Sequence, residues 1–323
     1  MNKSVCHTCI KSSLVMIALL MALCTPVLSG AKEPVVRFAF QDRIGSVLPI
    51  AAYRNGYFSD RGIRIKALRF SSGPACMESL FSGSADIAAM GDTTALILTA
   101  KNPAFIIIAS HSTGEHRHRI MVSQDSDIHS LPDLAGKRIG VKKGTSTYGG
   151  LLNALNAAGI PLDRIRITDL KPPTMIDALS VGSLDAFAAS EPTPSLAEQK
   201  GARELTSLGG LGNEYPVLIL ARKKWVNKKK PLLIQFLRAL KDGEHFNRLH
   251  PEETVTMMAG ETGLKSATVR SVMARHQYRL RMDRSILDSL RQTAAFLEDQ
   301  GIIKKTPDLT AVTAPDLVES LSH

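Results

Sequence analysis

Two nine-residue segments of this chain match each other without a gap, although they lie far apart in the sequence. The first reads Glu78-Ser-Leu-Phe-Ser-Gly-Ser-Ala-Asp86 and the second reads Asp177-Ala-Leu-Ser-Val-Gly-Ser-Leu-Asp185. The same register aligns Pro74 with Pro173 ahead of them, and Asp92 with Glu191 after them. Each copy is typical of a helix that begins at a proline, ends at a glycine and leads into a short strand. The duplication therefore predicts two lobes of like construction.

Short apolar strands alternate with helical segments over most of the chain, which predicts an α/β fold with mostly parallel sheets and helical crossovers. The predicted strands are Val35–Phe40, Ile63–Ala67, Ile87–Met90, Ala104–Ser110, Ile120–Ser123, Arg138–Val141, Ile165–Asp169, Ala186–Ala188 and Val217–Ala221. The helices predicted among them include Ser46–Asn55, Ala75–Ser82 and Thr94–Lys101. From Pro231 onward we expect the chain to be mainly helical.

The repeat and this alternation together predict the domain organisation. We expect a first lobe that begins at 34–112, a second lobe at 113–215, and a return to the first lobe with C-terminal helices at 216–323. Two crossovers between lobes form a hinge, and a hinge implies a cleft that opens and closes.

The amino terminus is typical of a secretory signal. Lys3 and Lys11 precede an uncharged apolar run, Leu14–Leu23, which is too short to span a bilayer. Small residues follow, so we expect residues 1–31 to be removed by cleavage after Ala31. A membrane anchor and a lipoprotein modified at Cys24 are the alternatives. The lipoprotein is less favoured because a leucine precedes that cysteine.

The net charge and the cysteine content limit the classes of function that are possible. The formal net charge is +10, and removal of the signal lowers it by two. The signal also holds three of the four cysteines, which leaves Cys76 with no partner for a disulfide. We find no helix-turn-helix signature, zinc knuckle or aromatic-rich basic stripe in the exported chain, so we expect no nucleic-acid partner. The basic surplus instead favours anions.

Ordered short motifs resemble the periplasmic binding proteins for aliphatic sulfonates, taurine and nitrate, and the sulfonate branch most. They are Phe40-Gln41, Gly56-Tyr57-Phe58, Phe70-Ser-Ser-Gly-Pro74, Gly83-Ser-Ala-Asp86, Gly91-Asp-Thr93, Asp133-Leu-Ala-Gly-Lys-Arg-Ile-Gly140, Lys143-Gly-Thr-Ser146 and Glu191-Pro192. The resemblance implies a type II periplasmic binding protein fold, a periplasmic location, and an ABC permease with its ATPase as partners. We expect the protein itself to be a monomer.

Three predicted strand ends are rich in hydroxyl residues and glycine, and each opens a helix. The candidate ligand-binding residues there are Ser71, Ser72, Gly73, Thr93, Thr94, Gly144, Thr145, Ser146 and Thr147. Helix starts expose unpaired amides and carry partial positive charge, which suits the oxygens of a sulfonate. Ordinary capping is the alternative, because Ser and Thr are common N-caps. The Gly144–Thr147 turn is the best single candidate, and Gln41, at the end of the first strand, adds an amide.

Two carboxylates complicate a purely anionic ligand. Asp92 and Glu191 occupy equivalent places in the two copies, where a sulfonate would be repelled. We favour structural roles for them, as a helix cap and a backbone partner near the hinge. The alternative is a zwitterionic ligand of taurine type whose ammonium binds one of them. Glu191 matches the acidic residue of the family's Trp-(Glu or Asp)-Pro motif, but Ser190 replaces the tryptophan.

Three histidines lie close together in sequence at the expected crossover. His111, His116 and His118 could suit a metal, but a solvated hinge edge is favoured, and we expect no metal and no cofactor. His111 is nevertheless a candidate for lining the cleft. Cys76 is expected to be a small buried residue.

These patterns predict the substrate-binding component of an ABC importer that captures a small organosulfonate or similar oxyanion, and not an enzyme. The alternatives are binding or synthesis of a thiamine precursor on the same fold, and a ligand-sensing periplasmic domain. A thiamine-pyrimidine synthase of this fold would need a cysteine-rich iron motif, whereas the exported chain holds one cysteine. A sensor would need a second membrane segment or fused module, and the chain ends at His323 with neither. The residues leave alkanesulfonate, taurine, nitrate, bicarbonate and a thiamine precursor open as ligands.

Overall fold

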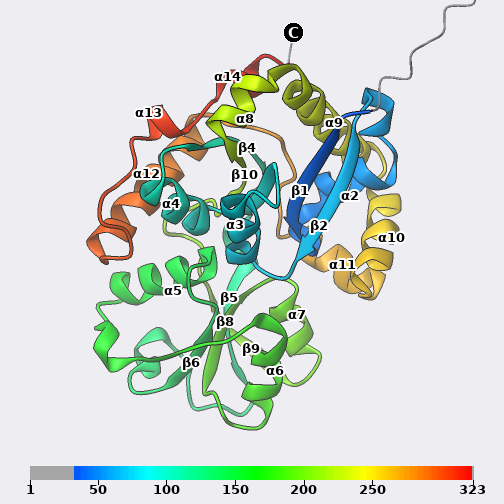
Figure 1. Ribbon diagram of the computed structural model, residues 1–323. Coiled ribbons are helices and arrows are strands. Elements are labelled where there is room, and N and C mark those ends of the chain that lie inside the picture. The colour runs from blue at the N-terminus through cyan, green and yellow to red at the C-terminus, as the bar shows by residue number, and fades with distance from the viewer. Residues whose placement is uncertain (1–32, 322–323) are drawn as a thin grey trace, which may run out of the picture. The chain divides into compact units, whose positions relative to one another are not determined.

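The computed structural model of the chain describes residues 33–321 (Figure 1). The signal segment, its cleavage point and Cys24 lie outside the described residues. Among the helices of 33–321, none combines the length and the apolar character needed to cross a membrane.

Ten strands form two five-stranded sheets. The first sheet has the order β2-β1-β3-β10-β4 and the second the order β7-β6-β8-β5-β9. The strands are β1 (Val35–Gln41), β2 (Arg64–Phe70), β3 (Ile87–Gly91), β4 (Phe105–Ser112), β5 (His118–Ser123), β6 (Arg138–Val141), β7 (Arg166–Asp169), β8 (Ala186–Ser190), β9 (Ala202–Ser207) and β10 (Val217–Arg222). We call the parts of the chain built on these two sheets the first lobe and the second lobe.

Helices connect the strands and then continue to the end of the described chain. The α-helices are α2 (Val47–Arg54), α3 (Gly73–Ser82), α4 (Asp92–Lys101), α5 (Ser146–Ala157), α6 (Pro172–Ser180), α7 (Thr193–Glu198), α8 (Lys223–Lys228), α9 (Lys230–Leu249), α10 (Pro251–Thr262), α11 (Ser266–Met273), α12 (Arg284–Asp299), α13 (Leu309–Val312) and α14 (Asp316–Glu319). Short 3-10 turns are η1 (Ile44–Ser46), η2 (Ser59–Arg61), η3 (Glu115–Arg117), η4 (Leu131–Leu134) and η5 (Leu162–Arg164).

Strand direction explains how the lobes are connected. In the first sheet, β1 pairs with β2 and β3 in parallel, whereas β10 is antiparallel to both β3 and β4. In the second sheet, β6 pairs with β7 and β8 in parallel, whereas β5 is antiparallel to β8 and β9. Each sheet is therefore mostly parallel, as predicted, and its one reversed strand is the strand that enters from the other lobe.

The chain passes between the lobes twice, from β4 to β5 and from β9 to β10. The two connecting segments touch, because the Gly114 amide donates to the Glu214 carbonyl at 3.0 Å. Arg117 joins them again, since its guanidinium donates to the Tyr215 carbonyl at 2.7 Å.

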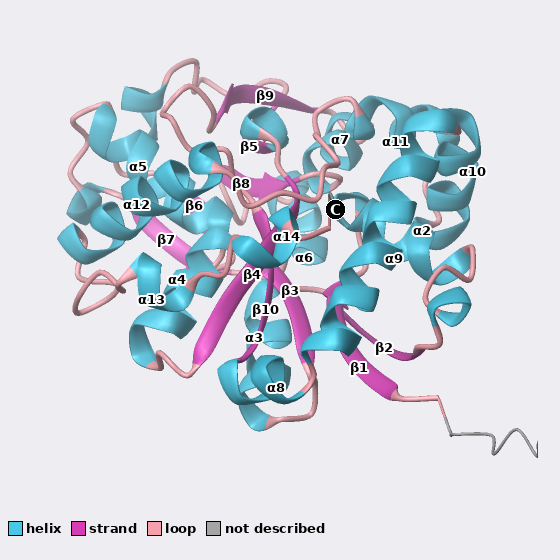
Figure 2. Ribbon diagram, turned by 90° about the horizontal axis from the view of Figure 1, so that it is seen from above, coloured by secondary structure: helices cyan, strands magenta, loops and turns pink. Residues whose placement is uncertain are grey.

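Each sheet is covered on both faces, as side-chain alternation along its strands requires. Phe38 and Phe40 of β1 pack with α2 and α9 on one face, whereas Ala39 packs with α3, α4 and α12 on the other. The helices α2 and α9 lie side by side in both views (Figures 1 and 2). In the second lobe, α5 packs on one face, and α6 and α7 pack on the other.

The sequence repeat becomes a repeated structural joint at the start of a strand in each lobe. The amide of Arg37 donates to Asp86 Oδ2 at 2.9 Å, and its guanidinium donates to both carboxylate oxygens. In the second lobe, Arg138 makes the same three contacts with Asp185. Its backbone amide donates to Asp185 Oδ2 at 2.7 Å, and its guanidinium donates to both carboxylate oxygens. The aspartate that closes each copy therefore fixes its strand against the neighbouring strand.

The nine strands predicted from sequence are present, with ends that differ by a few residues. The sequence missed β9, whose residues are mostly half-exposed and include Arg203 and Glu204. This strand lies at the edge of its sheet, where one apolar face is not required and the alternation is weak.

Candidate functional site

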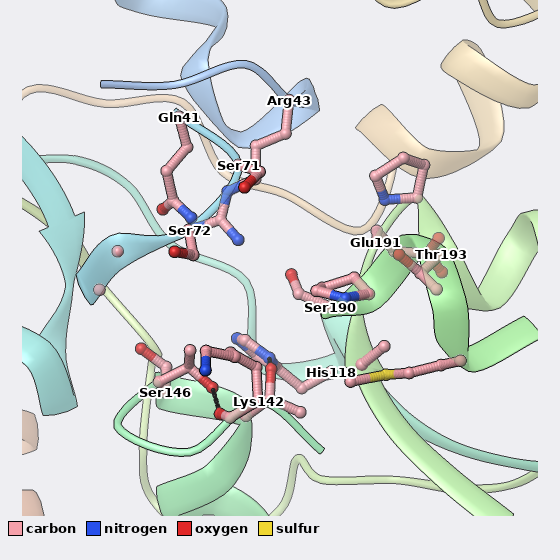
Figure 3. Close-up of a pocket in the computed structure, with 18 of the residues that line it drawn as sticks. Gln41, Arg43, Ser71, Ser72, His118, Lys142, Ser146, Ser190, Glu191 and Thr193 are labelled. Atoms are coloured by element: carbon pink, nitrogen blue, oxygen red, sulfur yellow. Dashed lines mark hydrogen bonds between the residues drawn. The ribbon is translucent and has the colours of Figure 1, made fainter. Parts of the chain in front are cut away.

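A cavity of about 290 Å³ lies where strand ends of the two lobes face each other (Figure 3). Its volume falls near the lower end of the range for small-molecule sites, about 300–1,000 Å³. The lining residues are Gln41, Asp42, Arg43, Ser71, Ser72, Gly73, Gly91, Thr94, His118, Lys142, Thr145, Ser146, Thr147, Pro172, Pro173, Met175, Ile176, Ala188, Ala189, Ser190, Glu191, Pro192, Thr193 and Leu196. We call this cavity the interlobe pocket.

The first lobe contributes the ends of parallel strands, which is where open α/β sheets bind ligands. Gln41 ends β1, and Ser71 and Ser72 follow β2 immediately before α3. The Gln41 side-chain oxygen is buried and has no hydrogen-bond partner within residues 33–321. Gly73 allows a close approach here, because a Cβ on it would lie 3.0 Å from Thr94 Oγ1.

The second lobe contributes the start of α5. Thr145 is its N-cap, and the Thr145 hydroxyl is already used, since it accepts from the Tyr148 amide and donates to the Lys142 carbonyl. Ser146 differs, because its hydroxyl is buried and unpartnered among the described residues. The amides of Ser146 and Thr147 are first-turn donors that lack an intrahelical acceptor. Ser146 and these amides are therefore the free donors of the turn.

Arg43 is the cationic side chain that the sequence analysis did not select. It follows β1 by two residues, and its guanidinium extends between Ser71 and Ser72 into the pocket (Figure 3). No carboxylate of residues 33–321 forms an ion pair with it, and its Nε is buried without a partner. Burial lowers the pKa of Arg43 to about 10, so the guanidinium stays charged at neutral pH. The hydroxyls and amides selected from sequence are therefore an incomplete set of donors, because they do not include this guanidinium.

The other basic group of the lining, Lys142, is neutralised locally. Its ammonium lies 2.9 Å from an oxygen of Asp169, and the pair is partly exposed. His118 adds no charge, because burial and the nearby Arg117 hold its pKa well below the usual value. Its Nδ1 lies 2.7 Å from the Thr147 hydroxyl.

Glu191 lies in the lining, but its carboxylate faces protein cations. The side chain is fully buried, and one of its oxygens lies 2.7 Å from Arg119, which is also fully buried. A second guanidinium, that of Arg275, lies 3.8 Å away, and the Ser195 amide donates to the other oxygen at 3.3 Å.

Asp92 lies outside the lining and is also fully buried. The Thr93 amide donates to one of its oxygens at 2.7 Å, and the Asn213 side chain donates to the other at 3.0 Å. The two equivalent carboxylates of the repeat therefore bind protein groups in this structure.

An apolar wall covers the second-lobe side of the pocket. It is formed by α6, α7 and the end of β8, and its residues are Pro172, Pro173, Met175, Ile176, Ala188, Ala189 and Leu196. Ser190 at the end of β8 is small, and its hydroxyl accepts from Arg117 at 3.0 Å. The wall therefore offers apolar contact on one side only, opposite the polar strand ends of the first lobe.

Of the thirteen residues selected from sequence, the pocket lining contains Gln41, Ser71, Ser72, Gly73, Thr94, Thr145, Ser146, Thr147 and Glu191. Outside it lie Asp92, Thr93, His111 and Gly144. Gly144 instead connects the lobes beside the pocket, because its carbonyl accepts from Thr94 Oγ1 at 2.8 Å. The imidazole of His111 is fully buried, and burial lowers its pKa to about 3.

The three histidines near the crossover do not converge on one point. His116 is exposed and lies 2.8 Å from the Ser207 hydroxyl, whereas His118 lines the pocket. No group of three potential metal ligands occurs within the described part of the chain. The thiol of Cys76 is buried in the first-lobe core, and burial raises its pKa to about 12.

Sequence reasoning missed Arg43, Lys142 and the apolar wall. The available signal for Arg43 was its place beside Gln41, just beyond the carboxyl end of a strand. The wall carried a weaker signal, because apolar residues at the start of a helix are usual in cores.

Two α/β lobes with a ligand-sized pocket between their strand ends are the architecture of the type II periplasmic binding protein fold. The chain belongs to the NMT1/THI5-like family, whose model matches residues 47–254. It is 25% identical to a putative aliphatic sulfonates-binding protein of Escherichia coli (strain K12), over 65% of this chain and 66% of that protein. The match therefore spans just under two thirds of that relative.

Solved structures share the fold. The alkanesulfonate-binding protein SsuA from Xanthomonas axonopodis pv. citri, bound to MOPS, superposes with a TM-score of 0.80 at 23% identity, over 88% of this chain and 100% of that one. The desulfurization enzyme DSZB superposes with a TM-score of 0.73 at 16% identity, over 90% of this chain and 99% of that one. The fold therefore carries both binding and catalysis, and the site must distinguish them.

Proposed function

We propose that this protein is the substrate-binding component of an ABC importer and captures a small organic oxyanion, such as a sulfonate, in the interlobe pocket. The observation that carries this proposal is the guanidinium of Arg43, which enters the pocket without a carboxylate partner among residues 33–321. Arg43 is half-buried, and its buried Nε has no partner in the described chain; such a charge is costly, and an anionic ligand would supply the missing partner.

Uncharged donors complete the proposed anion site. Gln41, Ser71, Ser72 and Thr94 approach from the first lobe, and the start of α5 approaches from the second. A helix start with free amides stabilises negative charge, and three sulfonate oxygens can accept from several such donors at once. The proposed ligand-binding set is Gln41, Arg43, Ser71, Ser72, Gly73, Thr94, Ser146 and Thr147, with supporting places for Asp92, Thr93, His111, Gly144, Thr145 and Glu191.

A ligand held by both lobes favours the closed arrangement by the difference in its affinity for the closed and open forms. We propose that the segments between β4 and β5, and between β9 and β10, are the hinge. The lobe boundaries that go with this hinge are 34–112, 113–215 and 216–323. The closed form, as a monomer, would then be the form that the permease and its ATPase recognise.

The place of action follows from the amino terminus. Residues 1–31 would direct export and be removed, which releases the mature protein into the periplasm. Anchoring as a lipoprotein at Cys24 is the less favoured alternative.

An enzyme on this fold is the second candidate. A cysteine nucleophile requires a thiolate, but Cys76 is buried with a pKa near 12 and lies outside the pocket lining. The lining does contain His118 and Lys142, so turnover must be tested directly.

A thermal-shift screen of the purified protein tests the proposal, with sulfonates, nitrate, bicarbonate and thiamine-pyrimidine precursors as ligands. We expect organic sulfonates to raise the Tm and to be recovered unchanged after prolonged incubation. A shift with pyrimidines alone, or consumption of the ligand that shifts the Tm, would contradict the importer assignment.

A further inference from the structure

We infer that the interlobe pocket selects organic anions whose other end is uncharged and apolar, and that it rejects ligands with an ammonium group. This inference rests on the proposed function and names the ligand class within it. It decides between the alkanesulfonate and taurine types that the sequence leaves open.

The first argument is that the Glu191 carboxylate is already ion-paired within the protein. Its side chain is fully buried, one oxygen is paired with Arg119 at 2.7 Å, and the other accepts from the Ser195 amide. Arg119 is held in turn by Glu198 at 2.7 Å and Glu204 at 2.8 Å, so this arrangement is fixed from several sides. An ammonium group in the pocket would have to compete with a guanidinium that is already bound.

The remaining carboxylates near the pocket are also engaged. Asp92 is fully buried behind the lining, with donors on both oxygens. Asp42 lies in the lining but is exposed and lies 3.3 Å from Arg69. Asp169 pairs with Lys142. Within residues 33–321, each carboxylate in or beside the pocket lining therefore already has a protein partner.

The second argument is the positive charge of Arg43. Arg43 enters the pocket with no ion-pair partner in the described chain, so the site carries one uncompensated positive charge. An anion neutralises this charge, whereas an ammonium group a few ångströms further along the same ligand is repelled by it.

The third argument is the wall opposite the polar strand ends. Met175 and Ile176 of α6 and Leu196 of α7 line the pocket beside Ala188 and Ala189 of β8. These side chains offer dispersion contacts and no hydrogen-bond acceptor. A desolvated ammonium placed against them would lose its hydration without compensation, whereas an alkyl or aryl group would gain from burial.

A matched pair of ligands tests the inference. Taurine and 1-propanesulfonate have nearly the same size and differ by an ammonium group in place of a methyl group. We expect calorimetric titration of the purified protein at neutral pH to show at least tenfold weaker binding of taurine. Equal or tighter binding of taurine would overturn the inference and leave the importer assignment intact. Failure of every organic anion in the screen would overturn both.

Variants at Arg43 test whether this residue causes the selectivity. We expect Arg43→Gln to weaken binding of 1-propanesulfonate at least thirtyfold and to reduce the preference over taurine. The matched control is Lys200→Gln, which removes an exposed cation that pairs with Asp177 outside the pocket lining, and should change the affinity less than threefold. Arg43→Lys keeps the charge if the glutamine variant fails to fold, and should retain the preference against taurine. An Arg43→Gln variant that folds and binds both ligands like the parent would overturn the role of Arg43, and so would an Arg43→Lys variant that folds but loses the preference against taurine.

Discussion

The two copies of the repeat are alike at their outer ends and different at the pocket. At the outer ends, Asp86 and Asp185 make the same contacts with Arg37 and Arg138, so the joint that fixes the strand is unchanged. At the pocket, the first copy begins with Ser71 and Ser72, whereas the second begins with prolines and continues into Met175 and Ile176. One scaffold therefore supports a polar wall and an apolar wall, which together suit an amphipathic guest.

The acidic residues that follow the two copies differ in the same way. Glu191 is held by an arginine network, whereas Asp92 is held by neutral donors. Asp92 and Glu191 occupy equivalent positions, but only Glu191 is part of a buried set of ion pairs.

The largest expected effect tests whether Glu191 and Asp92 differ in their contribution to stability. Removal of one partner of a buried ion pair costs about 3–5 kcal/mol, but Arg119 keeps two other carboxylates, so Glu191→Gln should lower the free energy of unfolding by about 2–3 kcal/mol. Asp92→Asn loses one well-placed acceptor and should cost about 1–2 kcal/mol. Denaturant titration measures both, with the more exposed Glu198→Gln as a control that should cost less than about 1 kcal/mol. If Asp92→Asn and Glu191→Gln lowered the free energy of unfolding equally, the arginine network around Glu191 would add nothing to stability.

A smaller effect sharpens the contrast between polar and apolar walls. Burial of each added methylene contributes up to about 0.8 kcal/mol, so affinity should rise along a series from methanesulfonate to hexanesulfonate. Ile176→Thr should weaken hexanesulfonate about tenfold and methanesulfonate less than twofold, because only the longer tail reaches the wall. Ile160→Thr, at a similarly buried position outside the pocket, controls for stability. A uniform loss across the series would remove the apolar wall from the binding site.

The smallest effect tests whether the outer joints are truly equivalent. Asp86→Asn and Asp185→Asn each weaken a partly exposed arginine pair, so each should lower the Tm by about 2–4 °C. Ligand affinity should change less than twofold in both, since both joints lie outside the pocket lining. Thermal scans that differ by more than this between the two variants would break the equivalence.

The sequence predicted most of the fold because its strongest signals were local. Apolar strands bounded by glycine and proline, and a repeated helix–strand unit, are visible without knowledge of distant contacts. The edge strand β9 was missed because its polar residues do not reveal a buried face.

The candidate site was only partly predictable, for a different reason. Hydroxyl residues at strand ends mark a ligand crevice, and most of those selected lie in the pocket lining. The fate of a charged side chain depends on its neighbours in space. Arg43 and Arg119 look alike in sequence, but one has no ion-pair partner within residues 33–321 and the other pairs with three glutamates. Only the tertiary structure distinguishes a charge that lines the pocket without an ion-pair partner in the described chain from one that is paired in the core.

The lobes also meet through two glycines, of which Gly91 lines the pocket and Gly149 lies outside the lining. A Cβ on Gly91 would overlap the Ser146 hydroxyl, and one on Gly149 would lie 2.7 Å from Thr93 Oγ1. A single methyl group at either place would keep the two lobes apart by steric overlap. It would weaken the apparent ligand affinity, because it lowers the population of the closed, binding-competent form. At Gly149, apparent affinity could thus be tuned without altering any residue that lines the pocket, which would give a graded set of optical biosensors with one shared specificity.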